Sequence, residues 1–126
     1  MKEDDFDRWL HAYGQAWTNG DVPAVLRLFA SEAQYFETPF DPPLVGHEEI
    51  QHYWTEGAAT SQRHVRFSYE ILSTQGQSGL AHWQATFRRV PGALRVALDG
   101  IIYAQFDEQG RCMIFREWWH RKESAP

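Results

Sequence analysis

The chain has 126 residues and a formal net charge of -5 at neutral pH, a length that suits one domain with a sizeable hydrophobic core. Aromatic residues make up 15% of it, with eight Phe, six Trp and five Tyr, so the fold must enclose many wide, flat side chains. The acidic balance and the lack of a Lys/Arg cluster argue against a nucleic-acid partner.

The first predicted element is an amphipathic helix within residues 4–17. Its apolar side chains recur at spacings of three and four residues, which is the stripe of a helix packed on a core. The stripe consists of Phe6, Trp9, Leu10, Tyr13 and Trp17. The helix is expected to end before Gly20.

Two further helices are predicted before the middle of the chain. Asp21 can cap a helix over residues 22–30, in which Pro23 occupies the first turn, where its missing N–H is harmless. Glu48 and Glu49 suit the positive end of a helix dipole, so we expect a third helix from Gly46 to about residue 57.

From residue 65 onward the hydrophobic period changes to two, which is typical of strands with one buried face. Turn sequences divide this half into four strands, at roughly 64–74, 79–90, 94–106 and 111–121, which should form an antiparallel meander. Three helices ahead of a one-sided sheet predict an α+β domain over residues 1–126, with the helices packed on the apolar face.

The first ten residues carry six charges, unlike a signal peptide, and no apolar run approaches the ~20 residues of a membrane span. Cys112 is the single cysteine, so no disulfide can form within the chain, which favours a reducing compartment. We therefore expect a cytoplasmic protein without a membrane partner.

Three stretches of the sequence resemble the nuclear transport factor 2-like superfamily, and its SnoaL-like branch in particular. They are YGQAWTNGDVPAVLRLFASEAQYFETP, GHEEIQHYW and LDGIIYAQFDEQG, and the resemblance covers almost the whole chain. It implies a cone-shaped, curved antiparallel sheet of four long strands plus a short first strand, wrapped around three N-terminal helices. Related folds include polyketide cyclases, ketosteroid isomerases, dehydratases, epoxide hydrolases and transport adaptors, so the fold alone does not select a function.

The bacterial ketosteroid isomerases of this superfamily allow a comparison residue by residue. An ungapped alignment from the first helix to the first strand places Tyr13 on their oxyanion-binding tyrosine and Glu37 on their catalytic aspartate. Aligning on Pro39 instead puts Thr38 in the aspartate's place. Their second oxyanion acid falls on Ile102, where this sequence departs from the pattern. The resemblance therefore implies a pocket with a phenol and a carboxylate.

The chemistry of Glu37 and Tyr13 makes both candidate catalytic residues. Desolvation against aromatic walls raises the pKa of a carboxylate and makes it a useful general base. A Tyr hydroxyl in the same cavity can donate a hydrogen bond to an oxygen as negative charge develops on it. Together they suit proton abstraction beside a carbonyl. Alternatively, Tyr13 is a core residue and Glu37 faces solvent at a strand edge.

The register of the last hairpin decides the orientation of Glu117, the third candidate catalytic residue. If Glu108 and Gln109 form a two-residue turn, Glu117 lies opposite Gly100 and faces the helix-covered side of the sheet. A bulged turn with Gly110 in the left-handed conformation would turn Glu117 outward. The sequence leaves both registers open.

Ten other residues are expected to line the ligand pocket: Trp17, Tyr35, Phe40, Tyr53, Trp54, Trp83, Phe87, Gly100, Ile102 and Trp119. Among them, Phe40 belongs to the segment TPFDPP, whose prolines should make a rigid lip over the open end of the cone. We expect the pocket to take an apolar or aromatic small molecule. No cofactor is expected, and no metal either, because no histidine pair has metal-ligand spacing on a helix.

Two functions fit these observations. The first is a cofactor-independent isomerase, cyclase or dehydratase that uses a pocket carboxylate as general base on a hydrophobic carbonyl compound. The alternative is a non-catalytic metabolite-binding or scaffolding domain. An inward Glu37 with a raised pKa favours the enzyme, and a Glu37 that points to water favours the binder.

The superfamily resemblance also implies a homodimer. The outer face of the predicted sheet makes this plausible, because it mixes charge with an aromatic residue, a composition that interfaces favour. The residues of this face are His82, Gln84, Thr86, Arg88, Arg95 and Tyr103.

Overall fold

Helix α1 (Glu3–Asn19) buries the whole apolar stripe that the sequence predicts. Its first turn carries three carboxylates, and the side chain of Asp5 accepts a hydrogen bond from the backbone N–H of Lys2 at 2.9 Å, an arrangement that suits the positive end of the helix dipole. The helix ends at Gly20, whose φ of 61° lies in the left-handed region that glycine adopts without strain. These features come from a computed structural model that describes residues 1–126.

Helix α2 (Val22–Arg27) is capped by Asp21, which accepts a hydrogen bond from the N–H of Ala24 at 3.1 Å. The prediction that this helix continues to residue 30 is wrong, because strand β1 (Phe29–Phe36) begins at Phe29. The strand conformation lets the Phe29 ring enter the core, where it is fully buried. Helix α3 (Gly46–Trp54) continues as one π-helical turn, Thr55–Ala59.

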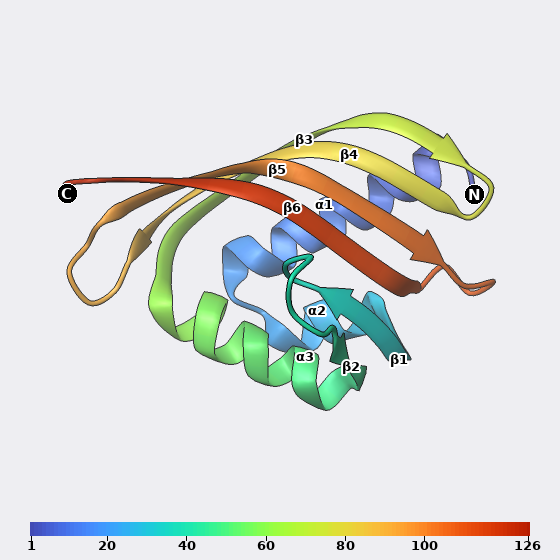
Figure 1. Cartoon of the computed structure of the whole chain (residues 1–126), viewed down its shortest axis with the longest axis horizontal. Helices are drawn as coiled ribbons and strands as arrows, with labels where there is room; N and C mark the ends of the chain where they lie inside the picture. Colours follow the sequence, from blue (N-terminus) through green and yellow to red (C-terminus); the bar gives the residue numbers. More distant parts are fainter.

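Six strands form one curved, open sheet in the order β2-β1-β6-β5-β4-β3. The long strands are β3 (Gln62–Gln75), β4 (Ser78–Arg89), β5 (Arg95–Phe106) and β6 (Cys112–Ser124), and they form the predicted antiparallel meander. Strand β1 pairs parallel with β6, and the short β2 (Leu44–Val45) pairs antiparallel with β1. Figure 1 shows the long strands arching over α1, with α2, α3 and the two short strands below them. The expected α+β fold is confirmed.

Glu117 faces inward, but the register of the last hairpin differs from both of the registers considered for it from the sequence. Gly110 is left-handed, with φ 79°, which moves the pairing by one residue so that Phe106 lies opposite Cys112. A second irregularity next to Phe106 moves it by one more, so that Ile102 lies opposite Glu117. Because side chains alternate between the faces of a strand, the two shifts cancel, and Glu117 is only 6% exposed.

Aromatic side chains fill the end of the core that lies under α1. The rings of Trp9 and Tyr13 stack with their centroids 5.4 Å apart, and the Trp9 Nε1–H donates to the carbonyl oxygen of Leu28 at 3.0 Å. Phe115 on β6 packs against both rings. This contact network fixes α1 on the sheet.

None of the helices is long and apolar enough to cross a membrane.

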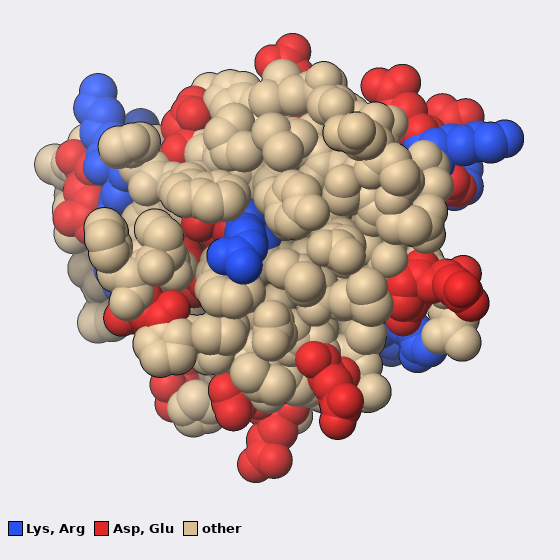
Figure 2. Space-filling model, turned by 45° about the vertical axis from the view of Figure 1, so that its right-hand side comes forward, with Lys and Arg blue, Asp and Glu red and all other residues tan.

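The outer face of the sheet carries a small polar network. The Asp99 carboxylate lies 2.8 Å from the Nε2 atom of His82 and accepts a hydrogen bond from the Gln84 amide, also at 2.8 Å. Trp118 projects from the same side of the sheet and is 44% exposed. On the face of the molecule in Figure 2, Lys and Arg stand apart from one another among acidic groups. The homodimer expected through the outer face stays a prediction.

Candidate functional site

A cavity of about 200 Å³ lies between the inner face of the sheet and helices α1 and α3. All three candidate catalytic residues, Tyr13, Glu37 and Glu117, line it. So do seven of the ten predicted pocket residues, namely Trp17, Tyr35, Tyr53, Trp54, Trp83, Phe87 and Trp119. The volume equals the share of roughly seven waters in liquid, and it is smaller than the ~300 Å³ at which sites for drug-sized ligands begin. The cavity therefore suits a small molecule.

Three predicted pocket residues lie outside this cavity. Phe40 sits in the loop between β1 and β2 and is 94% exposed. Gly100 is covered by β6, since a Cβ atom built on it would lie only 2.1 Å from the carbonyl oxygen of Trp118. Ile102 is fully buried in the core opposite Glu117. Alternation along a strand identified the correct face, but it could not show which positions a neighbouring strand covers.

Glu117 is the one buried charged residue of the protein. Burial raises its pKa to about 8, the negative charge of Glu37 adds to the rise, and a hydrogen bond from Tyr35 opposes it. In that bond the Tyr35 hydroxyl donates to Oε1 of Glu117 at 3.4 Å. At neutral pH the folded protein therefore holds Glu117 mainly as a neutral carboxylic acid, which has an O–H donor of its own.

Glu37 follows directly after β1 and is half-buried at the edge of the cavity. Its backbone carbonyl accepts a hydrogen bond from the Trp119 indole at 3.1 Å, which ties the end of β1 to β6. Burial raises the pKa of its carboxyl, the charge of Asp41 adds to the rise, and the hydroxyl of Tyr53 opposes it. Thr38 does not line the cavity. Of the two residues that the alignments left open, Glu37 is the one next to the aromatic walls.

Tyr13 and Tyr35 provide the phenols of the site, and both are almost completely buried. Burial raises the pKa of each hydroxyl well above the ordinary value, and the charge of Glu117 raises it further. Both hydroxyls therefore stay protonated and can act as hydrogen-bond donors. Tyr13 also packs on the rings of Trp54 and Phe67, so it is a core residue and a cavity residue at once.

Three polar residues of the cavity wall, Gln62, Arg89 and Arg121, were not predicted from the sequence. Arg89 continues the inward alternation of Trp83 and Phe87 on β4. Arg121 continues that of Glu117 on β6. Both arginines stand at strand positions that alternate in phase with the apolar, inward-facing residues. A charged residue at such a position is the sequence signal that identifies Arg89 and Arg121 as part of the wall. No group of three or more His, Cys, Asp or Glu side chains is placed to hold a metal ion.

Replacing Phe40 with Asp tests the predicted lip. The ring is exposed and borders a groove outside the cavity together with Glu37 and Trp119, so the free energy of unfolding should change by less than about 0.5 kcal/mol. Binding of an apolar fluorescent dye in this groove should weaken, because the substitution replaces an apolar ring with a charged carboxylate. Thermal melts and dye titrations measure the two effects. A large loss of stability with unaltered dye binding would make the loop a structural plug.

Comparison with known proteins gives one family and several structures of the same fold. Residues 10–113 match the family model described as a SnoaL-like domain. The chain is similar to SalBIII, an epoxide hydrolase/cyclase-like enzyme of pyran ring formation in the polyether salinomycin, with a TM-score of 0.82 and 18% identity over 94% of this chain and 93% of that one. It is also similar to the Δ5-3-ketosteroid isomerase of Mycobacterium sp., with a TM-score of 0.81 and 12% identity over 95% and 98% of the two chains.

A third similar structure is a computationally designed 17-OHP binder, with a TM-score of 0.81 and 13% identity over 94% of this chain and 96% of that one. At identities this low, the three structures establish a shared fold and nothing finer.

Proposed function

The chain belongs to the SnoaL-like domain family, and on that premise we propose that it binds a small apolar carbonyl compound and catalyses proton transfer beside the carbonyl. This activity is that of a cofactor-independent isomerase, cyclase or dehydratase. One observation carries the proposal, which is the presence of two carboxyl groups with different surroundings in one aromatic cavity. Glu117 is buried, with its pKa raised to about 8, whereas Glu37 is half-buried beside Tyr53. When the surroundings of two carboxyl groups move their pKa values apart, the group with the higher pKa suits the role of acid and the other suits the role of base.

Glu37 is the general base in this proposal. Glu37 is less buried than Glu117, so desolvation raises its pKa less, and the Tyr53 hydroxyl stabilises its charged form; it is therefore the carboxyl of the pair that ionises first. Its carboxylate takes the proton from the carbon next to the carbonyl, the C–H electron pair forms a C=C bond, and the carbonyl π electrons move to the oxygen. The neutral, buried Glu117 donates a hydrogen bond to that oxygen. Return of the proton from Glu37 to another carbon completes an isomerisation.

The comparison with ketosteroid isomerases supports the role of Glu117. Their second oxyanion acid falls on Ile102 of this chain, which has no acidic group. Glu117 lies directly opposite Ile102 on the neighbouring strand and carries a buried carboxyl. An acid supplied from β6 in place of β5 would serve the same oxygen. In this proposal Tyr35, which donates to Glu117, is a positioning residue, and Tyr13 is the second donor to the substrate oxygen.

Exchange of α-protons tests the proposal without knowledge of the natural substrate. Small cyclic ketones such as 2-indanone and cyclohexenone are incubated with the protein in D2O, and deuterium uptake beside the carbonyl is followed by NMR. The Glu37→Gln variant should lose roughly a hundredfold or more of the catalysed rate, since general-base catalysis contributes about that much. Glu48→Gln changes an exposed carboxylate outside the cavity and should keep the parental rate. Equal rates for the parent and Glu37→Gln would contradict the proposal.

Binding without chemistry is the second candidate function. The small, mostly aromatic cavity favours it, and the designed 17-OHP binder is a protein of similar fold that was made to bind and not to react. In that case the ketones should bind without deuterium uptake, and Glu37→Gln should leave their affinity unchanged. The same NMR samples therefore separate the two candidates.

A further inference from the structure

Arg89 is a cation without a partner on the inner face of the sheet. It is the last residue of β4 and lines the cavity. Its guanidinium takes part in none of the ion pairs of the structure, and its Nε atom is buried without a hydrogen-bond acceptor. Arg121, the other arginine of the wall, is paired with Glu123. Because a buried donor that lacks an acceptor destabilises the folded state, an acceptor from outside the chain would be bound favourably at Arg89.

Two tryptophans of the same cavity also lack acceptors. Trp54 and Trp83 are 4% and 2% exposed, and the Nε1–H of each has no partner. The other two cavity tryptophans are satisfied within the protein, since Trp17 donates to Gln62 Oε1 at 2.7 Å and Trp119 donates to a backbone carbonyl. Every buried side-chain polar atom without a partner is therefore a donor, and all three belong to the cavity wall. A ligand that carries acceptor oxygens could satisfy these donors.

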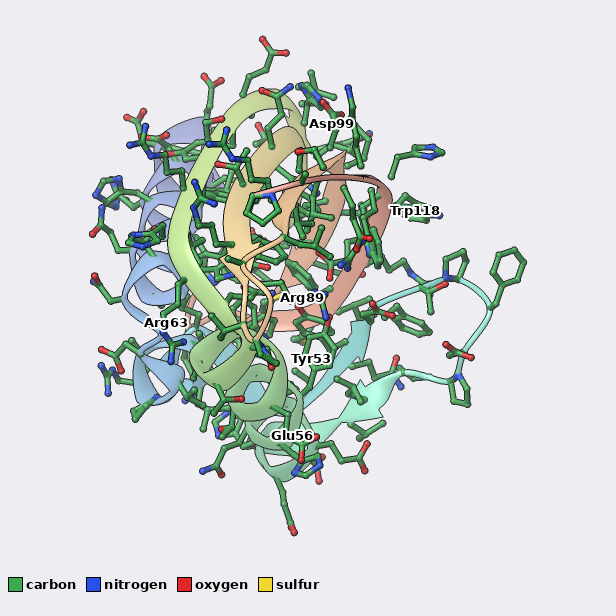
Figure 3. All side chains as sticks on the ribbon, turned by 90° about the vertical axis from the view of Figure 1, so that its left-hand side faces the viewer. Tyr53, Glu56, Arg63, Arg89, Asp99 and Trp118 are labelled. Atoms are coloured by element: carbon green, nitrogen blue, oxygen red, sulfur yellow. The ribbon has the colours of Figure 1, made fainter.

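Arg89 and the two carboxyl groups all line the cavity, and they also border two different surface grooves. Arg89 and Tyr53 also line an open groove along α3, whereas Glu37 and Glu117 border the groove beside the loop between β1 and β2. Figure 3 shows Arg89 and Tyr53 close together on the inner side of the sheet, with Glu56 pointing out from the α3 side of the molecule. A ligand that spans the cavity can therefore place one end at Arg89 and the other at Glu117.

We propose that the ligand is a small aromatic or alicyclic carboxylate whose anionic group binds Arg89. This inference rests on the proposed function and adds the substrate class to it, namely an apolar keto acid with its ketone at Glu37 and Glu117. A planar carboxylate matches the two parallel N–H donors of a guanidinium. Three carboxylates, Glu48, Glu49 and Glu56, line the groove that Arg89 borders, so a dianionic phosphate would meet more repulsion than a carboxylate does.

Isothermal titration calorimetry at pH 7.5 with 2-naphthoate and 2-naphthamide tests the proposal, because the two probes share their ring system and differ in charge. The parent protein should bind 2-naphthoate at least about tenfold more tightly than the amide, given the usual strength of hydrogen bonds to charged groups. Arg89→Met should abolish that preference and change amide binding less than about twofold. Arg121→Met is the matched control, since it removes an arginine of the same wall that already has a partner, and it should keep the preference.

Equal affinity of the parent for the two probes would overturn the proposal, and so would no measurable binding of 2-naphthoate or a preference that survives in Arg89→Met. Arg89→Lys retains a cation without the planar fork and should keep part of the preference, which gives a second measurement if Arg89→Met does not fold. Glu37→Gln removes a negative charge from the same cavity wall, so it should bind 2-naphthoate no more weakly than the parent does. A carboxylate preference without any ketone exchange would therefore reject the proposed chemistry and keep the ligand class.

Discussion

Replacing Glu117 with Gln is expected to raise the free energy of unfolding by on the order of 4 kcal/mol at pH 8.5 and to leave it nearly unchanged at pH 4, as a pKa raised from 4.5 to about 8 requires. The amide has the size of the carboxyl group and still accepts the hydrogen bond from Tyr35. It cannot ionise, so it removes the cost of a negative charge in an apolar cavity.

The sign follows from where the proton is held in each state. Between pH 4.5 and pH 8 the folded protein keeps the proton on Glu117, and the unfolded chain has released it. The folded state binds more protons in this window, so the stability from neutral Glu117 is fully present below pH 4.5 and is lost as the pH rises to about 8. The titratable and charged groups around the same cavity are Glu37, Tyr13, Tyr35, Tyr53, Arg89 and Arg121.

Urea unfolding of the parent and the variant at pH 4, 6, 7 and 8.5 measures the effect. Other groups titrate over this range in both proteins, so the difference between the two curves isolates Glu117. Glu48→Gln serves as the control, because it removes only an exposed carboxylate from the first turn of α3, and its difference from the parent should stay below about 1 kcal/mol. If the difference between the parent and Glu117→Gln does not grow with pH, Glu117 titrates normally in the folded protein, and its assignment as the neutral acid is wrong.

Much of the fold could be predicted from periodicity. The stripe of α1 and the alternation of the long strands each mark one apolar face, and burial against a single core makes those patterns regular. Features that depend on pairing between distant segments of the chain were harder to predict from the sequence. The end of α2 depends on Phe29 entering the core from a strand, and the orientation of Glu117 depends on two register shifts that cancel. Neither has a local pattern in the sequence.

In the cavity wall too, periodicity predicts some residues, and tertiary contacts determine the others. Trp83 and Phe87 could be assigned from the parity of β4, because an inward aromatic on a curved sheet faces the helices whatever the register. Parity also places Arg89 inward, but the long side chain of an arginine near a strand end can turn to solvent, so parity alone does not make it part of the wall. Phe40 lies in a loop and is exposed, because the direction of a loop depends on contacts that leave no periodic pattern in the sequence.

Position 100 on the inner face of β5 must be a glycine, because β6 approaches it too closely for a side chain. It lies opposite Trp119, and a Cβ atom there would meet the Trp118 carbonyl oxygen at 2.1 Å and the Trp119 Cβ atom at 2.9 Å. The carbonyl oxygen belongs to the backbone, so it cannot move without a displacement of β6. Trp119 in turn holds the carbonyl of Glu37, so this contact links the packing of the two strands to the position of the proposed base.

Gly100→Ala is therefore expected to lower the free energy of unfolding by roughly 2 to 4 kcal/mol, the upper range for overpacking of a well-packed core. It should also slow the ketone exchange that depends on Glu37, because β6 must shift beneath Trp119. Gly57→Ala is the matched control, because Gly57 lines the cavity and no atom lies within 4 Å of a Cβ built on it. An alanine in that helical turn should keep or slightly raise stability. Urea unfolding of both variants measures the contrast, and equal stability of the two would mean that β5 and β6 are not in close contact at Gly100.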